Sequence, residues 1–309
     1  MIFEVLHPFS VDAGFGKRFM MIMEVLSESH ELYWTRRILD LPEAIIRILR
    51  SQDPTILIYT SVISPTVVLL KALRPNLRIN YMVRGDEWGE FIYQGRRLRA
   101  WFALFGQRLL RTAGVRFVFV SWDLKDRIEA RIGDTTHVIL PNTLGHSISQ
   151  IKVFDGRIGL VGDFASVKNI EYVLEELSKT TWECHLFGNR TLPETWNNRN
   201  IISHGMVDDL VAELKENCSL VVFSSLSEGF PNVLLEALEA GCSVLVHDSY
   251  PFQQLPISKF WRYNLEPGSL RNRLQQLIDE PRDFLRDNRE FMELVAKDWA
   301  ATVKAAFLC

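Results

Sequence analysis

The sequence predicts an α/β protein made of two doubly wound domains, each with a parallel sheet between layers of helices. Three observations support this fold class. Short apolar runs rich in β-branched and aromatic residues alternate with amphipathic helical stretches, and the alternation occurs in two series. A turn-rich segment, PNTLG at 141–145, separates the two series. The length of 309 residues accommodates two domains of about 150 residues each.

The first series contains six short apolar runs that we interpret as strands. They are Ile2–Leu6, Glu31–Tyr33, Ile56–Tyr59, Arg78–Val83, Phe117–Val120 and His137–Leu140. Between the runs, apolar residues recur at helical spacing and predict helices. These are Lys17–Glu28, Pro42–Ser51, Ser64–Leu73, Arg96–Thr112 and Leu124–Arg131. Strands that alternate with helices of this length form βαβ units, so the sheet is expected to be parallel.

The second series repeats the pattern with five strands. They are Arg157–Val161, Glu183–Phe187, Ile201–Ser203, Ser219–Phe223 and Ser243–Val246. The predicted helices are Asn169–Ser178, Asp208–Glu216, Pro231–Ala240, Ser269–Asp279 and a longer, broken stretch at Arg282–Phe307. We therefore expect one domain at 1–145, a second at 146–285, and a C-terminal helical segment at 286–309.

The composition is that of an ordinary globular protein, with 47% hydrophobic and 24% charged residues. No apolar run reaches the about 18 residues that a membrane span needs, and the first residues lack the pattern of a signal peptide. The four cysteines are scattered with no CxxC pair, so a zinc site or a disulfide framework is not expected. These features favour a cytoplasmic protein.

The charge is distributed unevenly along the chain. Residues 1–150 contain 19 Lys and Arg against 15 Asp and Glu, whereas residues 151–309 contain 16 against 23. A basic first half suggests an anionic partner for that domain, and chance variation in surface charge is the alternative. Nothing in the pattern indicates a nucleic-acid partner.

The strongest candidate site follows the strand Ser219–Phe223. In an open parallel sheet, ligands bind at the carboxyl ends of the strands, and Glu228 lies in such a position. Gly229 allows close approach of the backbone to a ligand, and Pro231 is suited to the start of a helix. The amides of Asn232 and Val233 are then expected at the helix N-terminus, where free amides and the helix dipole attract a phosphate.

One turn further along this helix, Glu236 can accept hydrogen bonds from sugar hydroxyls. The strand–loop–helix junction therefore combines carboxylates for hydroxyls with amides for phosphate, as a nucleoside-diphosphate sugar requires. The alternative is an acidic first helical turn that complements the dipole and needs no ligand. That alternative suits Glu236 alone better than it suits the whole segment.

The segment EGFPNVLLEALEAGCSVL closely resembles the signature of family 4 (group 1) retaining glycosyltransferases of the GT-B fold, and Glu228 and Glu236 have its Glu-x7-Glu spacing. The resemblance implies two Rossmann-like domains with a cleft between them, and a C-terminal helix, near Trp299, that crosses back to the first domain. It also implies that Glu228 binds the hydroxyls of the donor sugar and that Glu236 binds the ribose. The backbone of Gly229, Phe230, Asn232 and Val233 then binds the diphosphate.

The resemblance extends to RIGLVGDFASVKN at 157–169 and, more weakly, to Pro141-Asn142. It implies that Lys168 pairs with the donor phosphate, so that Glu228 and Lys168 carry the chemistry. It also implies that Gly188 and Gly205, at later strand ends, lie near the base and ribose. Asp163 stands where the family usually has an arginine, and a carboxylate there would repel a diphosphate. Either Lys168 acts alone, or Arg190 or Lys17 takes the place of that arginine.

In the first domain, Gly14, Gly16 and Lys17 form a glycine loop that opens a helix, which is a second candidate anion site. The alternative is a turn that allows tight packing of strand on helix. Arg84-Gly85-Asp86-Glu87 resembles an acceptor-domain segment of some family members, so Arg84, Asp86 and Glu87 are candidates to bind acceptor hydroxyls. A structural ion pair between these residues is equally compatible with the sequence.

Two further features leave alternatives open. The stretch RRLRAWFALFGQRLLR at 96–111 combines five arginines with aromatic and aliphatic residues, which suits an anionic membrane interface. A core helix with a solvated arginine face is the alternative. Among the histidines, His7 at a strand end and His146 in the linker are candidate site residues, although a structural role is the more common one for such a histidine.

Together the resemblance implies a hexosyltransferase that retains configuration at the transferred carbon. It would use a nucleotide-sugar donor and a glycan or lipid-linked glycan acceptor, in bacterial surface polysaccharide or lipopolysaccharide synthesis, peripherally on the inner face of the cytoplasmic membrane. The chain has no Asp-x-Asp motif, so we expect no metal and no other cofactor. A nucleotide-sugar epimerase of the same fold and a non-catalytic scaffold protein are the alternatives.

Overall fold

The computed structural model describes residues 2–6, 22, 24–26, 31–35, 40–52, 54–83, 85–162, 166–188, 196, 200–249 and 251–308. The chain divides into two compact units. Unit 1 comprises Met1–Asn142 and Trp299–Cys309, and unit 2 comprises Thr143–Asp298. We expected the first boundary at 145 and the C-terminal segment from 286. The structure assigns residues 286–298 to unit 2, so only the last helix returns to unit 1.

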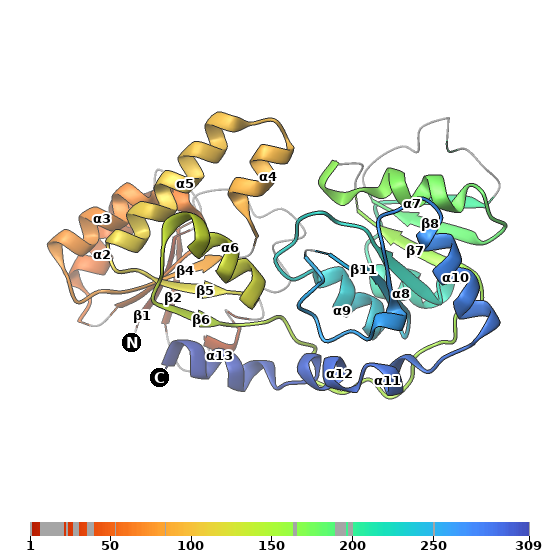
Figure 1. The fold of residues 1–309 in the computed structure, drawn as a ribbon. Coiled ribbons are helices and arrows are strands. Elements are labelled where there is room, and N and C mark those ends of the chain that lie inside the picture. Colours follow the sequence, from red (N-terminus) through yellow and green to blue (C-terminus); the bar gives the residue numbers. More distant parts are fainter. Residues whose placement is uncertain are drawn as a thin grey trace. The chain divides into compact units, whose positions relative to one another are not determined.

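Unit 1 is built on a six-stranded parallel sheet with the order β2-β1-β3-β4-β5-β6 (Figure 1). The strands are β1 Ile2–Leu6, β2 Glu31–Thr35, β3 Pro54–Ile58, β4 Arg78–Val83, β5 Arg116–Phe119 and β6 His137–Ile139. The helices are α2 Leu41–Arg50, α3 Ser64–Leu73, α4 Glu87–Tyr93, α5 Arg97–Thr112, α6 Trp122–Ile132 and α13 Trp299–Leu308, with a short 3-10 turn, η2, at Ser61–Ile63. The sequence analysis did not predict two of these elements, α4 and the short turn η2.

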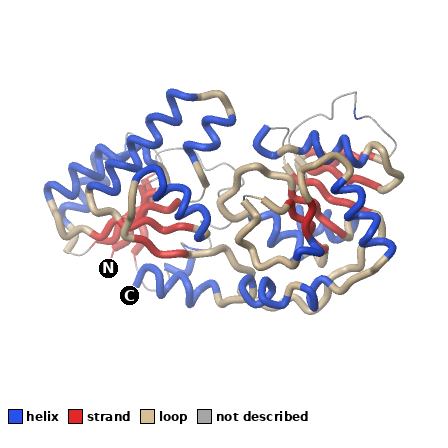
Figure 2. The backbone as a smooth tube through the Cα atoms, viewed as in Figure 1, coloured by secondary structure: helices blue, strands red, loops and turns tan. Residues whose placement is uncertain are grey.

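One face of this sheet packs on the C-terminal helix. A core cluster joins Met82 and Val118 of the sheet to Trp299 and Phe307 of α13, together with helical residues near Leu26. Because side chains alternate along a strand, Tyr81 and Phe117 project to the opposite face, where their rings meet edge to face at 5.2 Å. Helices α2, α3 and α5 lie on that opposite side (Figures 1 and 2). The sheet is therefore covered on both faces, as a doubly wound fold requires.

Helix α5 buries a face that consists mostly of small residues and exposes most of its large apolar ones. Its inward face consists of Ala100, Ala103, Gly106, Gln107 and Leu110. Its outward face carries apolar side chains at helical spacing, namely Leu98, Trp101, Phe102 and Phe105, which are 72%, 67%, 63% and 50% exposed. One side of the helix therefore packs in the core and its arginines are exposed, as one of the two interpretations expected, but large apolar side chains share the exposed side with the arginines. Within the described residues, no helix is long and apolar enough to span a bilayer.

The packing of α5 depends on Gly106. A Cβ atom at this position would lie 2.5 Å from the backbone carbonyl oxygen of Ser61. We predict that Gly106→Ala lowers the free energy of unfolding by about 1–3 kcal/mol, because overpacking against backbone outweighs the better helix propensity of alanine. Urea unfolding of the full chain measures the change in the free energy of unfolding. Arg99→Ala, on the exposed side of the same helix, should change stability by less than about 0.5 kcal/mol. Unchanged or increased stability of Gly106→Ala would show that α5 packs differently.

Unit 2 contains a second six-stranded parallel sheet, with the order β12-β11-β10-β7-β8-β9. Its strands are β7 Arg157–Val161, β8 Glu183–Phe187, β9 Ile201–Gly205, β10 Leu220–Phe223, β11 Ser243–His247 and β12 Arg262–Tyr263. Its helices are α7 Ile170–Leu177, α8 Leu210–Asn217, α9 Asn232–Glu239, α10 Ser269–Asp279, α11 Phe284–Asp287 and α12 Arg289–Val295, with 3-10 turns η3 at Ser166–Lys168 and η5 at Lys259–Trp261. The expected stretch Arg282–Phe307 is thus three separate helices.

The strand order of unit 2 defines where a ligand can bind. The first strand, β7, lies in the middle of the sheet between β8 and β10. The chain continues from β7 to β8 and β9 on one side, and then returns to add β10, β11 and β12 on the other. The direction of winding therefore reverses between β7 and β10. In open α/β sheets, ligands bind outside the carboxyl ends of the strands at such a reversal point.

Candidate functional site

The loops that follow β7 and β10 contact one another at this reversal point. Lys168, at the end of η3, forms an ion pair with the Glu228 carboxylate from the loop after β10. The Ser224 hydroxyl donates to the Lys168 carbonyl oxygen at 2.8 Å, and the Leu226 amide donates to the Val167 carbonyl oxygen at 2.7 Å. The two residues that were expected to carry the chemistry are 60 positions apart in the sequence and lie together here.

The segment after Glu228 leads directly into α9. Phe230 is buried and Pro231 is the N-cap, so the helix begins at Asn232, one residue later than the sequence suggested. Asn232 and Val233 therefore form the first turn, whose amides point out of the helix end. Glu236 lies one turn further along and is partly buried. A carboxylate, a cation and a helix N-terminus thus share one end of the sheet.

Gly188 and Gly205 meet at the neighbouring strand ends. The Gly188 amide donates to the Gly205 carbonyl oxygen at 2.8 Å, immediately beyond β8. Gly205 has φ of +69°, a left-handed conformation that glycine adopts without strain. The next strand end is tied to these two in the same way, since the Gly162 amide donates to the Phe187 carbonyl oxygen at 2.9 Å. The carboxyl ends of β7, β8 and β9 therefore form one continuous edge.

On its other side, the loop after β10 is held by two buried side chains from β11 and β12. The His247 imidazole contacts the Ser225 carbonyl oxygen through Nε2 at 2.8 Å and the Ser249 hydroxyl through Nδ1 at 2.6 Å. The Tyr263 hydroxyl donates to the carbonyl oxygen of Phe223, the last residue of β10, at 2.9 Å. The sequence analysis missed both residues, although a histidine that ends the otherwise apolar run SVLVH is a detectable signal.

The surroundings of His247 determine its protonation. The imidazole is fully buried, and burial, followed by the nearby Arg262 guanidinium, lowers its pKa below the ordinary value. A carbonyl oxygen only accepts, so Nε2 carries the proton and donates to Ser225, while Nδ1 accepts from the Ser249 hydroxyl. Burial also raises the pKa of Tyr263 well above its usual value, so that its hydroxyl remains a donor.

Several predicted site residues lie outside the part of the chain that the structure describes. They are Gly14, Gly16, Lys17, Arg84, Arg190 and Asp163. The roles given to them above remain predictions, including the effect of Asp163 in place of an arginine.

Asp86 and Glu87 are described, and both have structural partners. Arg131 donates to the two carboxylate oxygens of Asp86 at 2.7 and 2.6 Å, and the Gly89 amide donates to one of them at 3.1 Å, so Asp86 caps α4 and is 3% exposed. The Ser61 hydroxyl donates to Glu87 at 2.9 Å. Of the two carboxylates, Glu87 is the better placed to meet a ligand because it is only partly buried.

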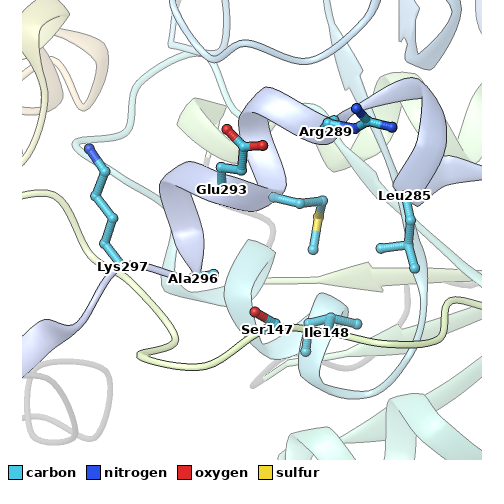
Figure 3. Close-up of a pocket in the computed structure, with 8 residues that line it drawn as sticks. Ser147, Ile148, Leu285, Arg289, Glu293, Ala296 and Lys297 are labelled. Carbon is cyan, nitrogen blue, oxygen red and sulfur yellow. The ribbon is translucent and has the colours of Figure 1, made fainter.

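A separate pocket of about 340 Å³ lies in unit 2, beside the segment that follows the unit boundary (Figure 3). Ile148, Leu285 and Met292 contribute apolar walls, and Arg289 and Lys297 extend away from its centre. The backbone beside it is tied by the Leu144 amide, which donates to the Val295 carbonyl oxygen at 2.7 Å. None of the predicted site residues lines this pocket, so it is distinct from the Lys168–Glu228 site.

Comparisons with known proteins bear on both units. Sucrose-phosphate synthase from Thermosynechococcus elongatus superposes with a TM-score of 0.68 at 14% identity, covering 99% of this chain and 94% of that one. The N-terminal domain of trehalose-6-phosphate phosphatase from Candida albicans gives 0.67 at 11% identity, with 99% and 98% covered. AviGT4, a glycosyltransferase involved in avilamycin A biosynthesis, gives 0.61 at 12% identity, with 98% and 95% covered. No curated protein matches the sequence.

These similarities identify the fold as GT-B, the two-domain α/β fold of nucleotide-sugar glycosyltransferases. Residues 155–257, which contain β7, Lys168, Glu228 and α9, match the family model Glycosyl transferases group 1. The matched residues include the Glu228–Glu236 segment, so the similarity to group 1 glycosyltransferases that the sequence implied is confirmed for this part of unit 2.

Proposed function

We propose that the chain transfers a hexose from a nucleoside-diphosphate sugar to a hydroxyl of a glycan or lipid-linked glycan. The observation that carries this proposal is the Lys168–Glu228 ion pair at the reversal point of the unit 2 sheet, next to the start of α9. A donor needs positive charge for its diphosphate and an acceptor of hydrogen bonds for its sugar hydroxyls. This site offers both in adjacent loops.

In the proposed arrangement, the diphosphate binds Lys168 and the amides at the start of α9. Glu228 then exchanges its partner: it releases Lys168 to the phosphate and accepts hydrogen bonds from the sugar. Glu236 binds the ribose, and the edge around Gly188 and Gly205 receives the rest of the nucleoside. The ion pair keeps both side chains extended toward the same point before the donor arrives, which reduces the ordering that binding requires.

In the proposed reaction, the bond between the anomeric carbon and the diphosphate oxygen breaks, and an acceptor hydroxyl oxygen bonds to the same carbon. The proton of that hydroxyl passes to the leaving diphosphate, so no separate base is needed. Lys168 and the α9 amides stabilise the charge that develops on the leaving group. We propose family 4 membership, retention of configuration and independence from metal ions, on the basis of the Glu-x7-Glu spacing and the lack of an Asp-x-Asp motif.

We further propose that unit 1 binds the acceptor and that α5 holds the protein on an anionic membrane from the cytoplasmic side. The exposed face of α5 carries Leu98, Trp101, Phe102 and Phe105. Ile92 and Tyr93, at the end of the adjoining α4, are also exposed. Exposed arginines at 96, 97 and 99 flank these side chains. Apolar side chains with an arginine border match a bilayer surface that has acidic headgroups. A lipid-linked acceptor in a bacterial surface glycan pathway would be met at that surface.

Incubation with UDP-, GDP- and ADP-hexoses tests the reaction class. We expect one of them to be consumed with release of the nucleoside diphosphate, faster when a panel of methyl hexosides is added as acceptors. Conversion of a donor to its epimer without release of the diphosphate would instead identify an epimerase. Binding of a donor with no consumption under any condition would favour a non-catalytic scaffold protein.

A further inference from the structure

We infer that His247 is a positioning residue for the donor site, and that it acts by fixing the loop that carries Glu228. The inference rests on the proposed function, because it concerns the site where the donor is expected to bind. His247 itself is fully buried behind this loop and is not expected to touch the donor.

The loop after β10 is attached to its neighbours along nearly its whole length. On the side of β7, Ser224, Leu226 and Glu228 contact residues 167 and 168. On the side of β11, the attachment beyond the strand end is the hydrogen bond from His247 Nε2 to the Ser225 carbonyl oxygen at 2.8 Å. The contacts alternate between the two sides. The loop is therefore held from the β11 side by His247 and from the β7 side by residues 167 and 168.

Packing fixes the orientation of the imidazole. Its ring meets Phe252 edge to face at 5.0 Å and Tyr263 at 6.3 Å, and the Ser249 hydroxyl occupies Nδ1. The segment that holds Phe252 is tied in turn by Arg262, which donates to the Phe252 and Leu255 carbonyl oxygens at 3.2 and 2.7 Å. These contacts hold the imidazole in its observed orientation, so that the position of Nε2 sets the position of the Ser225 carbonyl group.

Loss of this bond has a specific consequence. The Ser225 carbonyl oxygen would remain buried without its donor, and the loop would relax to satisfy it. Glu228 lies three residues further on, so a shift at Ser225 moves its carboxylate away from the sugar hydroxyls. Positioning errors of this kind reduce binding and turnover although no donor contact has been removed. The expected effect is a higher KM for the donor and a lower kcat.

Three variants separate positioning from simple loss of stability. In His247→Gln the amide nitrogen reaches the place of Nε2, so the bond to Ser225 is kept. In His247→Asn the amide reaches only the place of Nδ1. The bond to Ser225 is therefore lost, although the new side chain has a similar polarity. His185→Leu removes another buried imidazole from the same sheet, one that bonds to His204 at 2.9 Å and lies on β8, which β7 separates from β10.

Calorimetric titration with UDP, GDP and ADP and their hexose conjugates, with thermal unfolding in parallel, provides the test. We expect His247→Asn to weaken binding of the nucleotide sugar by about 10-fold or more, His247→Gln to restore it to within about 3-fold, and His185→Leu to bind like the wild-type chain. Equal binding by cooperatively folded Gln and Asn variants would overturn the inference. Failure of the wild-type chain to bind any of the probes would instead overturn the proposed function.

Discussion

Replacing Glu228 with glutamine is expected to reduce sugar transfer by about 10- to 100-fold while leaving the affinity for the free nucleoside diphosphate intact or increased. A hydrogen bond to a charged group contributes about 1.5–3 kcal/mol, which corresponds to a rate change of this size. The affinity for the diphosphate should not decrease, because the substitution removes the carboxylate that neutralises Lys168 in the wild-type chain. Initial rates of diphosphate release and titration with the free diphosphate measure the two effects separately.

Lys168 provides the opposite half of this experiment. Lys168→Met should weaken binding of both the diphosphate and the nucleotide sugar, since it removes the cation and leaves the Glu228 carboxylate to repel the phosphates. Glu239→Gln serves as the matched control for Glu228→Gln, because Glu239 lies at the exposed end of the same helix, α9. Unchanged turnover in both Glu228→Gln and Lys168→Met would contradict the site assignment.

Replacing two exposed side chains of α5 with glutamate, Trp101→Glu with Phe102→Glu, is expected to abolish membrane binding. Burial of an aromatic side chain contributes about 1.5–3 kcal/mol, so the loss of both should reduce partitioning by at least about 100-fold. The two added negative charges also oppose an anionic surface. Because these side chains are 67% and 63% exposed, the substitutions should leave unit 1 folded.

Flotation with phosphatidylglycerol vesicles at modest salt measures this effect, with phosphatidylcholine vesicles for comparison. Val153→Glu with Met206→Glu is the matched control, since it adds the same charge at two apolar side chains of unit 2 that are 57% and 63% exposed. The control should float with the phosphatidylglycerol vesicles as the wild-type chain does. Failure of the wild-type chain to bind either type of vesicle would contradict the membrane proposal.

The elements that the sequence predicted best are those whose residues repeat a simple pattern. Strands β4, β7 and β8 and helices α3 and α10 have the predicted bounds, because each is a short, mostly apolar run or a helical repeat between turn residues. Helix α4 was missed, since the acidic residues at its start, Asp86 and Glu87, are typical of a polar loop. The sequence does not show that Arg131 pairs with Asp86 in the folded chain. Strand β12 was missed because it has only two residues, one of them a buried arginine.

In the candidate site, too, residues in local sequence patterns were predictable and tertiary contacts were not. Glu228, Lys168 and the start of α9 were predictable because their chemistry is encoded in contiguous segments that resemble a known family. The hydrogen bond that supports them was not predictable, since it joins His247 of β11 to Ser225 in the loop after β10 and depends on the order of the sheet. The sequence analysis named His7 and His146 as candidates instead, and His7 lies outside the described residues. His146 is exposed and contacts only the Leu144 carbonyl oxygen among the described residues.

Helix α5 illustrates a limit of pattern analysis. From its sequence, a helix rich in both arginine and aromatic residues could bury either its aromatic side or its side with small residues. Gly106 favours burial of the side with small residues. Its close contact with the Ser61 backbone places that side inward, so that the aromatic side faces outward. That contact joins residues 45 positions apart and leaves no local signature in the sequence.

The central claim is that the edge formed by Lys168, Glu228 and the start of α9 binds a nucleoside-diphosphate sugar. Calorimetric titration of the wild-type chain with UDP-, GDP- and ADP-hexoses tests it most directly. We predict saturable binding of one nucleotide class, weakened by Lys168→Met and not by Glu239→Gln. Absence of binding by all three classes, or binding that Lys168→Met leaves unchanged, would contradict the claim.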